Sequence, residues 1–273
     1  IDEVLDLEFV NTKAISECKF KVVVDAVNST GGVAIPLLLE RLGVEAVKIH
    51  CEPNGQFPHN PEPLKQHLTD LSEKVISSNA DFGIAVDPDV DRLAFMDEKG
   101  IMFGEEYTLV ACADYILSQR PGNTVSNLSS TRALRDVTKK HGGTYIASAV
   151  GEVNVVNAMK STNAVIGGEG NGGIIYPESH YGRDALVGVA LFLSLLAERK
   201  MAVSALRASY PSYFMSKKKI DLNPSINVDA ILEAMESKYR HEEISTIDGL
   251  KIDFQTEWVH LRKSNTEPII RIY

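Results

Sequence analysis

Cysteine is scarce in this sequence. Only three of the 273 residues are cysteine, namely Cys18, Cys51 and Cys112, and no two of them form a Cys-x-x-Cys pair. An odd number of widely spaced cysteines argues against a disulfide framework and against a cysteine-based zinc site.

Long hydrophobic runs and targeting signals are also missing. The longest apolar stretch, Ala185–Ala197, has about 13 residues, which is too short to span a bilayer and predicts a buried helix. The first residues contain no charged segment followed by an apolar one, as a signal peptide would. We therefore expect a cytoplasmic protein that does not bind membranes, as a monomer or weak dimer.

Positive charge is in the minority. Lysine and arginine number 28 against 37 acidic residues, so the net charge is -9, and a nucleic-acid partner would require a local basic patch. The densest basic run, Lys217–Lys219, leads into Ile220–Leu222 and indicates the start of an exposed strand. We expect no nucleic-acid partner.

The order of predicted elements indicates an α/β protein. A short β-branched run at 21–25 is followed by a glycine-containing turn, a helical pattern at 33–42 and a second strand at 44–49, which together form a βαβ unit. A proline-rich crossing, a helix at 64–78, strands at 82–86 and 93–96 and a helix at 107–118 complete the first unit. A second unit after Gln119–Asn123 repeats this plan, with strands at 124–128, 144–147 and 164–168 and helices at 131–141, 153–160 and 185–198. Beyond Tyr210 the pattern changes to strands at 217–222, 248–254 and 257–262 around a helix at 228–239.

Three aspartates follow the strand at 82–86. Asp87, Asp89 and Asp91 alternate along the chain, at the carboxyl end of a strand, where open α/β sheets bind ligands. Hard divalent cations prefer carboxylate oxygens, and Pro88 stiffens the loop. A solvated acidic turn is one alternative. A calcium EF-hand is another, but Arg92 stands where that loop requires glycine. We interpret the loop as a magnesium site, which predicts a phosphate nearby.

A glycine-rich loop ends the strand at 164–168. Residues 167–173 contain five glycines, and Glu169 and Asn171 are its only side chains able to accept or donate a hydrogen bond. Such a loop lets a ligand approach the backbone closely, and this pair of side chains suits the hydroxyls of a sugar. A flexible hairpin is the alternative. It is not a Walker loop, since no Gly-Lys-Ser/Thr follows.

A third polar segment lies near the end of the sequence. Residues 262–268, together with Arg271, combine arginine, lysine, hydroxyl and amide side chains, which are typical phosphate donors. An exposed polar turn is the alternative.

These segments together resemble the α-D-phosphohexomutases, a family that includes phosphoglucomutase, phosphomannomutase and phosphoglucosamine mutase. The run DPDVDR is similar to the family's magnesium loop, GEGNGG to its sugar-specificity loop and RKSNTEPIIR to its phosphate-binding loop. The turn Ala149–Glu152 resembles one that contacts the sugar phosphate. The four motifs occur in the family's order and are spread from residue 87 to residue 271, and the resemblance covers essentially the whole chain.

The resemblance implies a fold and a domain plan. It predicts two successive three-layer α/β/α domains with mixed sheets, followed by a smaller, truncated α+β domain. We expect the family's domain II at 1–119, domain III at 120–212 and an incomplete domain IV at 213–273.

The resemblance also implies chemistry: Mg²⁺-dependent phosphoryl transfer between the 1- and 6-positions of a hexose phosphate. The metal ligands would be Asp87, Asp89 and Asp91, and Arg92 would stabilise the transferring group. The implied substrate-binding residues are Gly151, Glu169, Asn171, Arg262, Ser264, Asn265, Thr266 and Arg271. The tyrosine-containing segment 181–184 after the glycine loop favours a glucosamine phosphate, with glucose and mannose phosphates as alternatives.

One family element has no counterpart in this sequence. The family carries a phosphorylated serine in a Ser-His-Asn-Pro motif, whereas the His59–Pro61 run here is preceded by Pro58, which has no hydroxyl. We interpret that run as a coincidence and expect the phosphoserine and the general base to belong to a preceding domain. The sugar loop also departs from the family's Ser-Gly-His, since Asn171, Gly172 and Gly173 stand there. An alternative without catalysis is a phosphosugar- or magnesium-binding protein.

Overall fold

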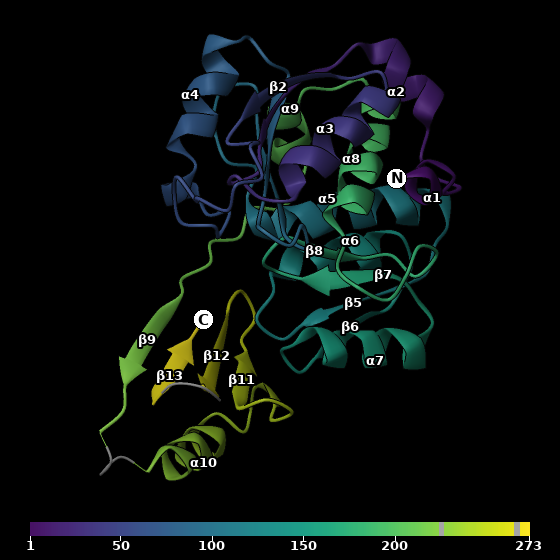
Figure 1. Cartoon of the computed structure of the whole chain (residues 1–273). Coiled ribbons are helices and arrows are strands. Elements are labelled where there is room, and N and C mark those ends of the chain that lie inside the picture. Colours follow the sequence, from purple (N-terminus) through teal and green to yellow (C-terminus); the bar gives the residue numbers. More distant parts are fainter. Residues whose placement is uncertain (224–226, 265–267) are drawn as a thin grey trace.

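The computed structural model describes residues 1–223, 227–264 and 268–273, and it contains three sheets (Figure 1). The helices are α1 (Asp2–Leu5), α2 (Thr12–Cys18), α3 (Gly31–Arg41), α4 (Thr69–Ser77), α5 (Glu105–Gln119), α6 (Arg132–Lys140), α7 (Glu152–Thr162), α8 (Ala185–Arg199), α9 (Val203–Ala208) and α10 (Val228–Lys238), with a 3₁₀ turn η1 (Lys65–His67). The strands are β1 (Lys21–Asp25), β2 (Glu45–Ile49), β3 (Phe82–Val86), β4 (Leu93–Met96), β5 (Asn123–Asn127), β6 (Tyr145–Ser148), β7 (Ala164–Glu169), β8 (Gly173–Ile175), β9 (Lys218–Asp221), β10 (Glu243–Ser245), β11 (Leu250–Asp253), β12 (Trp258–Lys263) and β13 (Ile269–Ile272).

The first two sheets share one plan. The strand order is β2-β1-β3-β4 in the first and β6-β5-β7-β8 in the second. In each sheet three strands are parallel, and the last is an antiparallel hairpin partner of the third. The carboxyl ends of β3 and β7 therefore lead directly into hairpin loops, and these are the aspartate loop and the glycine loop.

Both faces of the first sheet are covered because its central strand is apolar on both sides. Val22 and Val24 of β1 pack in a core that also contains buried residues of α3, α5 and α8, whereas Val23 faces Leu71 and Val75 of α4. A strand buried on both faces is expected to be a continuous β-branched run, as β1 is.

Helix α8 joins the two α/β units. It follows the second sheet in the sequence, yet Phe192 stacks on Phe95 of β4 with ring centroids 3.7 Å apart. Phe192 also makes edge contacts with Phe82 of β3 and with Phe103. The same core includes Ile166 of β7. The two units therefore share one continuous hydrophobic core.

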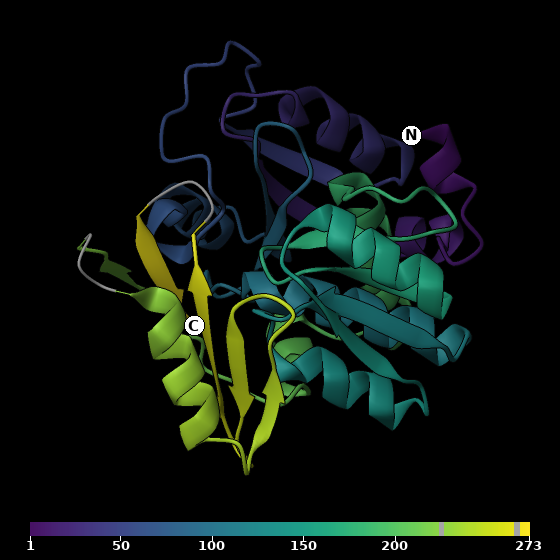
Figure 2. The same ribbon diagram turned by 90° about the horizontal axis from the view of Figure 1, so that it is seen from below.

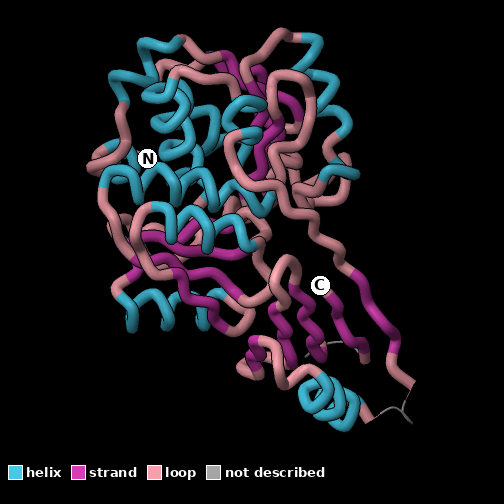
Figure 3. The backbone as a smooth tube through the Cα atoms, turned by 180° about the vertical axis from the view of Figure 1, so that it is seen from behind, coloured by secondary structure: helices cyan, strands magenta, loops and turns pink. Residues whose placement is uncertain are grey.

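The third unit is an antiparallel sheet in the order β10-β11-β12-β13-β9, with α10 beside it (Figure 2). An extended segment after α9 leads to its edge strand β9 (Figure 3). Partly buried polar contacts hold this sheet against the second unit. Arg132 Nη2 lies 2.8 Å from Asp253 Oδ1, and Ser129 Oγ lies 2.9 Å from His260 Nδ1.

The expected fold of two α/β/α units with mixed sheets and a smaller α+β unit is confirmed. Individual elements differ from the predictions. The helix expected at 64–78 is a 3₁₀ turn followed by α4, because the backbone leaves the helical conformation at Leu68, whose side chain is buried. Strand β8 was not predicted, since its three residues are too few for a pattern. Among the described residues, no helix has the length and apolarity that crossing a bilayer requires.

Candidate active site

The aspartate loop, the glycine loop and the carboxyl end of the chain border one cavity of about 550 Å³. Arg92 lines it from the first loop, and Glu169, Gly170 and Asn171 line it from the second. The remaining walls include Glu62–Leu64, Val150–Glu152, Lys217, Arg271 and Tyr273. The fold thus brings together segments that are far apart in the sequence.

The three aspartates of the first loop form a compact oxygen cluster. One carboxylate oxygen from each of Asp87, Asp89 and Asp91 lies within 4.8 Å of the others. Asp87 is buried and its Oδ1 accepts the backbone N–H groups of Asp91 and Arg92 at 3.1 and 3.0 Å. These bonds fix the loop in a bend that turns the alternate side chains toward one point.

Neighbouring elements hold this loop in place. The hydroxyls of Ser29 and Thr30, just before α3, both donate to the carbonyl of Pro88 at 2.7 Å. The backbone N–H of Ala185, at the start of α8, donates to the carbonyl of Val90 at 3.0 Å. The aspartates are therefore preorganised from both sides.

Electrostatics favour a cation in the aspartate loop. Burial and, to a smaller extent, the nearby charges of Asp91 and Asp89 raise the pKa of Asp87 to about 7. A divalent cation bound among the carboxylates would relieve this repulsion. Three clustered carboxylates are a donor set that suits Mg²⁺. They are not themselves part of the cavity lining, which the loop reaches through Arg92.

Arg92 links the aspartate loop to the proline-rich crossing. Its Nε lies 3.5 Å from Asp87 Oδ2 and 3.9 Å from Asp91 Oδ1, and its Nη1 lies 3.4 Å from Glu62 Oε1. The guanidinium lies at the cavity wall beside the aspartates, where it could contact an anion.

The glycines of the second loop are required by close protein packing. A Cβ at Gly170 would overlap the carboxylate of Glu106, and a Cβ at Gly172 would overlap the carbonyl of Leu93 in β4. Gly172 also has a φ of +92°. We expected these glycines to admit a ligand, and the structure adds that they let the loop pack against β4 and α5.

Arg183 is the residue that sequence reasoning missed. Its guanidinium pairs with Asp91 of the aspartate loop and with Glu169 of the glycine loop, the latter at 3.1 Å. Its Nε lies 3.1 Å from Glu152 Oε2. A Cβ at Gly173 would overlap the Arg183 side chain, so this glycine leaves it room. In the sequence, the segment 181–184 was used only to favour a glucosamine phosphate. No motif indicated that its arginine pairs with three carboxylates.

Glu169 and Gly151 are in direct contact. Glu169 Oε1 accepts from Asn127 Nδ2 at 2.8 Å and from the backbone N–H of Gly151 at 3.3 Å. Gly151 has a φ of +113° and immediately precedes α7. Asn171 Oδ1 accepts the N–H of Gly173 at 3.2 Å, and Asn171 lines the cavity. Buried Glu169 is thus rigidly positioned at the wall.

The predicted phosphate-binding residues occupy different places. Arg271 lines the cavity, whereas Arg262, in the adjacent strand, donates through Nε to Asp248 Oδ2 at 2.9 Å and is not part of the lining. The backbone N–H of Ser264 donates to the carbonyl of Ile269. Asn265 and Thr266 lie outside the described residues. The structure also adds Lys217 to the cavity wall.

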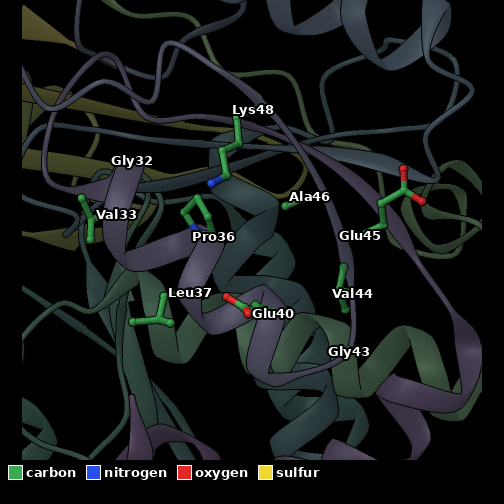
Figure 4. A pocket seen from close by; sticks show the side chains of 10 residues that line it. All are labelled: Gly32, Val33, Pro36, Leu37, Glu40, Gly43, Val44, Glu45, Ala46 and Lys48. Carbon is green, nitrogen blue, oxygen red and sulfur yellow. The ribbon is translucent and has the colours of Figure 1, made fainter.

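A larger hollow of about 660 Å³ lies between α3 and the edge strand β2 (Figure 4). Its lining is mainly glycine and apolar residues of these two elements, with Glu40, Glu45 and Lys48 as the charged lining residues. Glu45 pairs with Lys21 at 3.5 Å. The lining of this hollow has no set of side chains that converge as ligands. It is therefore a weaker candidate for the active site than the cavity bordered by the aspartate loop, the glycine loop and the carboxyl end of the chain.

Glu106, which lies beneath the glycine loop, is expected to make the free energy of unfolding depend on pH. Burial raises its pKa from 4.5 to about 8. Between these values the folded chain retains a proton that the unfolded chain has lost, so stability falls as pH rises, by up to about 1.4 kcal/mol per pH unit. Glu106→Gln should remove this component in urea unfolding measured from pH 5 to 8.

Glu17→Gln, at an exposed ion pair, is the matched control and should leave the pH dependence unchanged. If Glu106→Gln has the same slope as the parent chain, the buried carboxyl is not the protonated group.

The fold and site define a chain with two α/β/α units whose hairpin loops face one cavity. Comparison with known families gives two matches: phosphoglucomutase/phosphomannomutase alpha/beta/alpha domain II over residues 1–100, and domain III of the same family over residues 104–213. The chain belongs to the phosphoglucomutase/phosphomannomutase family, which confirms the resemblance of its motifs.

Individual relatives agree with this. A phosphoglucomutase/phosphomannomutase of Thermococcus kodakarensis is 36% identical over 97% of this chain, and a probable phosphoglucosamine mutase of Methanopyrus kandleri is 32% identical over 92% of it. The chain spans only 58% and 56% of these two proteins. A crystal structure of a phosphoglucomutase/phosphomannomutase family protein from Burkholderia thailandensis matches 96% of this chain and 58% of its own, with a TM-score of 0.82 and 29% identity.

Proposed function

We propose that this chain supplies the metal-binding and sugar-binding parts of a phosphohexomutase that moves a phosphoryl group between the 1- and 6-positions of glucosamine phosphate. The observation that carries the proposal is the convergence of the aspartate loop, the glycine loop and Arg271 on one cavity of about 550 Å³. The relatives' names support the class of reaction. They divide between glucosamine and glucose or mannose phosphates, so the substrate is the part to be tested.

The side chains around the cavity suit phosphoryl transfer. Asp87, Asp89 and Asp91 would hold Mg²⁺, which when bound neutralises charge on a transferring phosphoryl group. Arg92 would contact the equatorial oxygens of that group, since its guanidinium lies beside the same carboxylates.

The opposite end of the substrate would lie toward the third unit. Arg271 and Lys217 are the cations of that wall and would bind the phosphate that is not reacting. Arg262, Ser264, Asn265 and Thr266 belong to the same proposed loop. Glu169 and Asn171 would orient the sugar hydroxyls between the two ends, with the backbone at Gly151 beside them.

The chain itself should bind but not convert the substrate, because none of its serines stands in a Ser-His-Asn-Pro context. A phosphorus NMR titration with glucosamine 6-phosphate, glucose 6-phosphate and mannose 6-phosphate, with Mg²⁺ present, tests this. Selective shifts with glucosamine 6-phosphate and no conversion are expected. Preference for another sugar phosphate would change the substrate assignment. Turnover by the chain alone would contradict the prediction that it lacks the phosphorylated serine.

Asp89→Ala should abolish tight Mg²⁺ binding, because it removes one of three ligand oxygens at an exposed position that does not support the fold. Isothermal titration calorimetry with Mg²⁺ measures the loss. Asp81→Ala removes an exposed carboxylate outside the loop and is the control. Unchanged Mg²⁺ affinity in Asp89→Ala would refute the metal assignment.

A further inference from the structure

A second group of metal-binding side chains lies beyond the cavity. Asp25 ends β1, His50 follows β2, and His59 belongs to the proline-rich crossing. One ligand atom from each lies within 4.8 Å of the others. Because β1 and β2 are neighbouring parallel strands, their carboxyl ends meet at one edge of the sheet. The aspartate loop follows β3, on the other side of β1.

The hydrogen bonds of His59 leave one nitrogen facing a carboxylate. His59 Nδ1 lies 2.8 Å from the carbonyl oxygen of Asn60, which only accepts, so Nδ1 carries a proton. His59 Nε2 then lies 3.1 Å from Asp25 Oδ2. If the His59 ring is neutral and Asp25 is ionised, His59 Nε2 and Asp25 Oδ2 are both acceptors. A cation, either a proton or a metal ion, must therefore lie between them.

His50 has the complementary arrangement. Its Nε2 lies 3.0 Å from Oδ2 of Asp70, an exposed carboxylate, and so donates to it. The lone pair of the neutral ring is then on Nδ1. Histidines that bind metals usually donate their other N–H to a carboxylate or a backbone carbonyl, which fixes the tautomer. His50 has the carboxylate and His59 has the carbonyl.

Asp25 completes the set as a buried carboxyl group. Its side chain is 1% exposed, and the backbone N–H of Val27 donates to Oδ1 at 3.0 Å. This bond leaves Oδ2 for a cation on the side of His59. A buried carboxylate is costly unless it is paired or coordinates a metal.

We propose that Asp25, His50 and His59 form a second metal site, separate from the aspartate loop, that binds Zn²⁺ or a similar transition-metal ion. Two imidazoles and one carboxylate suit such ions, whereas the three carboxylates of the other loop suit Mg²⁺. A water molecule would take the fourth position of a tetrahedral Zn²⁺ site.

This site would have a structural effect on the cavity. His59 is three residues before Glu62, and Glu62–Leu64 line the cavity while Glu62 contacts Arg92. A metal ion bound by His59 would therefore tie the proline-rich crossing to the sheet at the point where it reaches the cavity. The His-Asn-Pro run, which we interpreted as a coincidence, then has a function that does not require phosphorylation.

Titration of this chain with Zn²⁺ alone, and with Co²⁺ followed by its visible absorption, tests the proposal. We expect one equivalent of Zn²⁺ to bind and Co²⁺ to give the intense bands of a four-coordinate site. His59→Ala and His50→Ala should lower Zn²⁺ affinity by more than roughly 100-fold, and Asp70→Ala, at an exposed side chain, by roughly 10- to 100-fold.

Two controls separate this site from others. His67→Ala removes a histidine whose ring contacts only the backbone of Glu62 among the described contacts, and it should bind Zn²⁺ like the parent chain. Asp89→Ala should also retain Zn²⁺ binding, because it affects only the magnesium loop. No saturable Zn²⁺ binding by the parent chain, or equal affinity in the His50 and His59 variants, would overturn the proposal and leave an imidazolium–carboxylate pair.

Discussion

Replacing Phe192 by alanine is expected to destabilise the chain by about 3–5 kcal/mol, because it removes a fully buried ring and leaves a cavity. The ring stacks on Phe95 and makes edge contacts with Phe82 and Phe103. Since the core around α8 includes residues of both α/β units, both should lose stability together. Urea unfolding followed by circular dichroism and by fluorescence measures the change.

The matched control for this change is Phe214→Ala, at a fully exposed phenylalanine, which should alter stability by no more than about 0.5 kcal/mol. If Phe192→Ala unfolds the first unit in a separate transition while the second keeps its stability, the shared core does not couple the units.

Replacing Arg183 by methionine should also cost about 3–5 kcal/mol, because it leaves three carboxylates facing one another without their common partner. Asp91, Glu152 and Glu169 all pair with this guanidinium, and Glu169 is buried. Methionine keeps most of the side-chain volume, so the loss would reflect the charge and its hydrogen bonds. The free energy of unfolding from urea titration at pH 7 measures it.

Arg41→Met is the control for Arg183→Met. Arg41 forms a surface pair with Asp2, and both side chains are more than half exposed, so its loss should cost less than about 1 kcal/mol. A similarly small loss for Arg183→Met would mean that the three carboxylates are solvated or protonated and do not depend on the arginine.

Most of the fold could be predicted from local patterns. The strands at 21–25, 82–86 and 93–96 have the predicted bounds, because each is an apolar run between clear turn signals. The repeat of the βαβ plan was also visible. Short elements such as β8 and β10 were missed, since three residues do not establish a period. Their strand identity depends on a partner strand elsewhere in the chain.

The candidate site was predictable in part, for a related reason. The aspartate and glycine loops are contiguous motifs, so their residue types were visible before the structure was known. Arg183 was not predicted as a site residue, because its three carboxylate partners come from three separate segments. The same holds for Asp25, His50 and His59, which come from separate segments of the sequence. The pairing of β1 with β2 brings Asp25 and His50 together, and the proline-rich crossing brings His59 to them.

The sequence by itself determined the α/β plan, the carboxylate-rich hairpin loop after β3 and the glycine loop after β7, because each depends on the order of neighbouring residues. Only the tertiary structure decided that α8 packs against the first sheet and that Arg183 ties the two loops together. The tertiary structure likewise directs Arg271 to the cavity and Arg262 to Asp248. These outcomes depend on the burial of apolar surface and the pairing of charge between distant segments, and no local pattern encodes either.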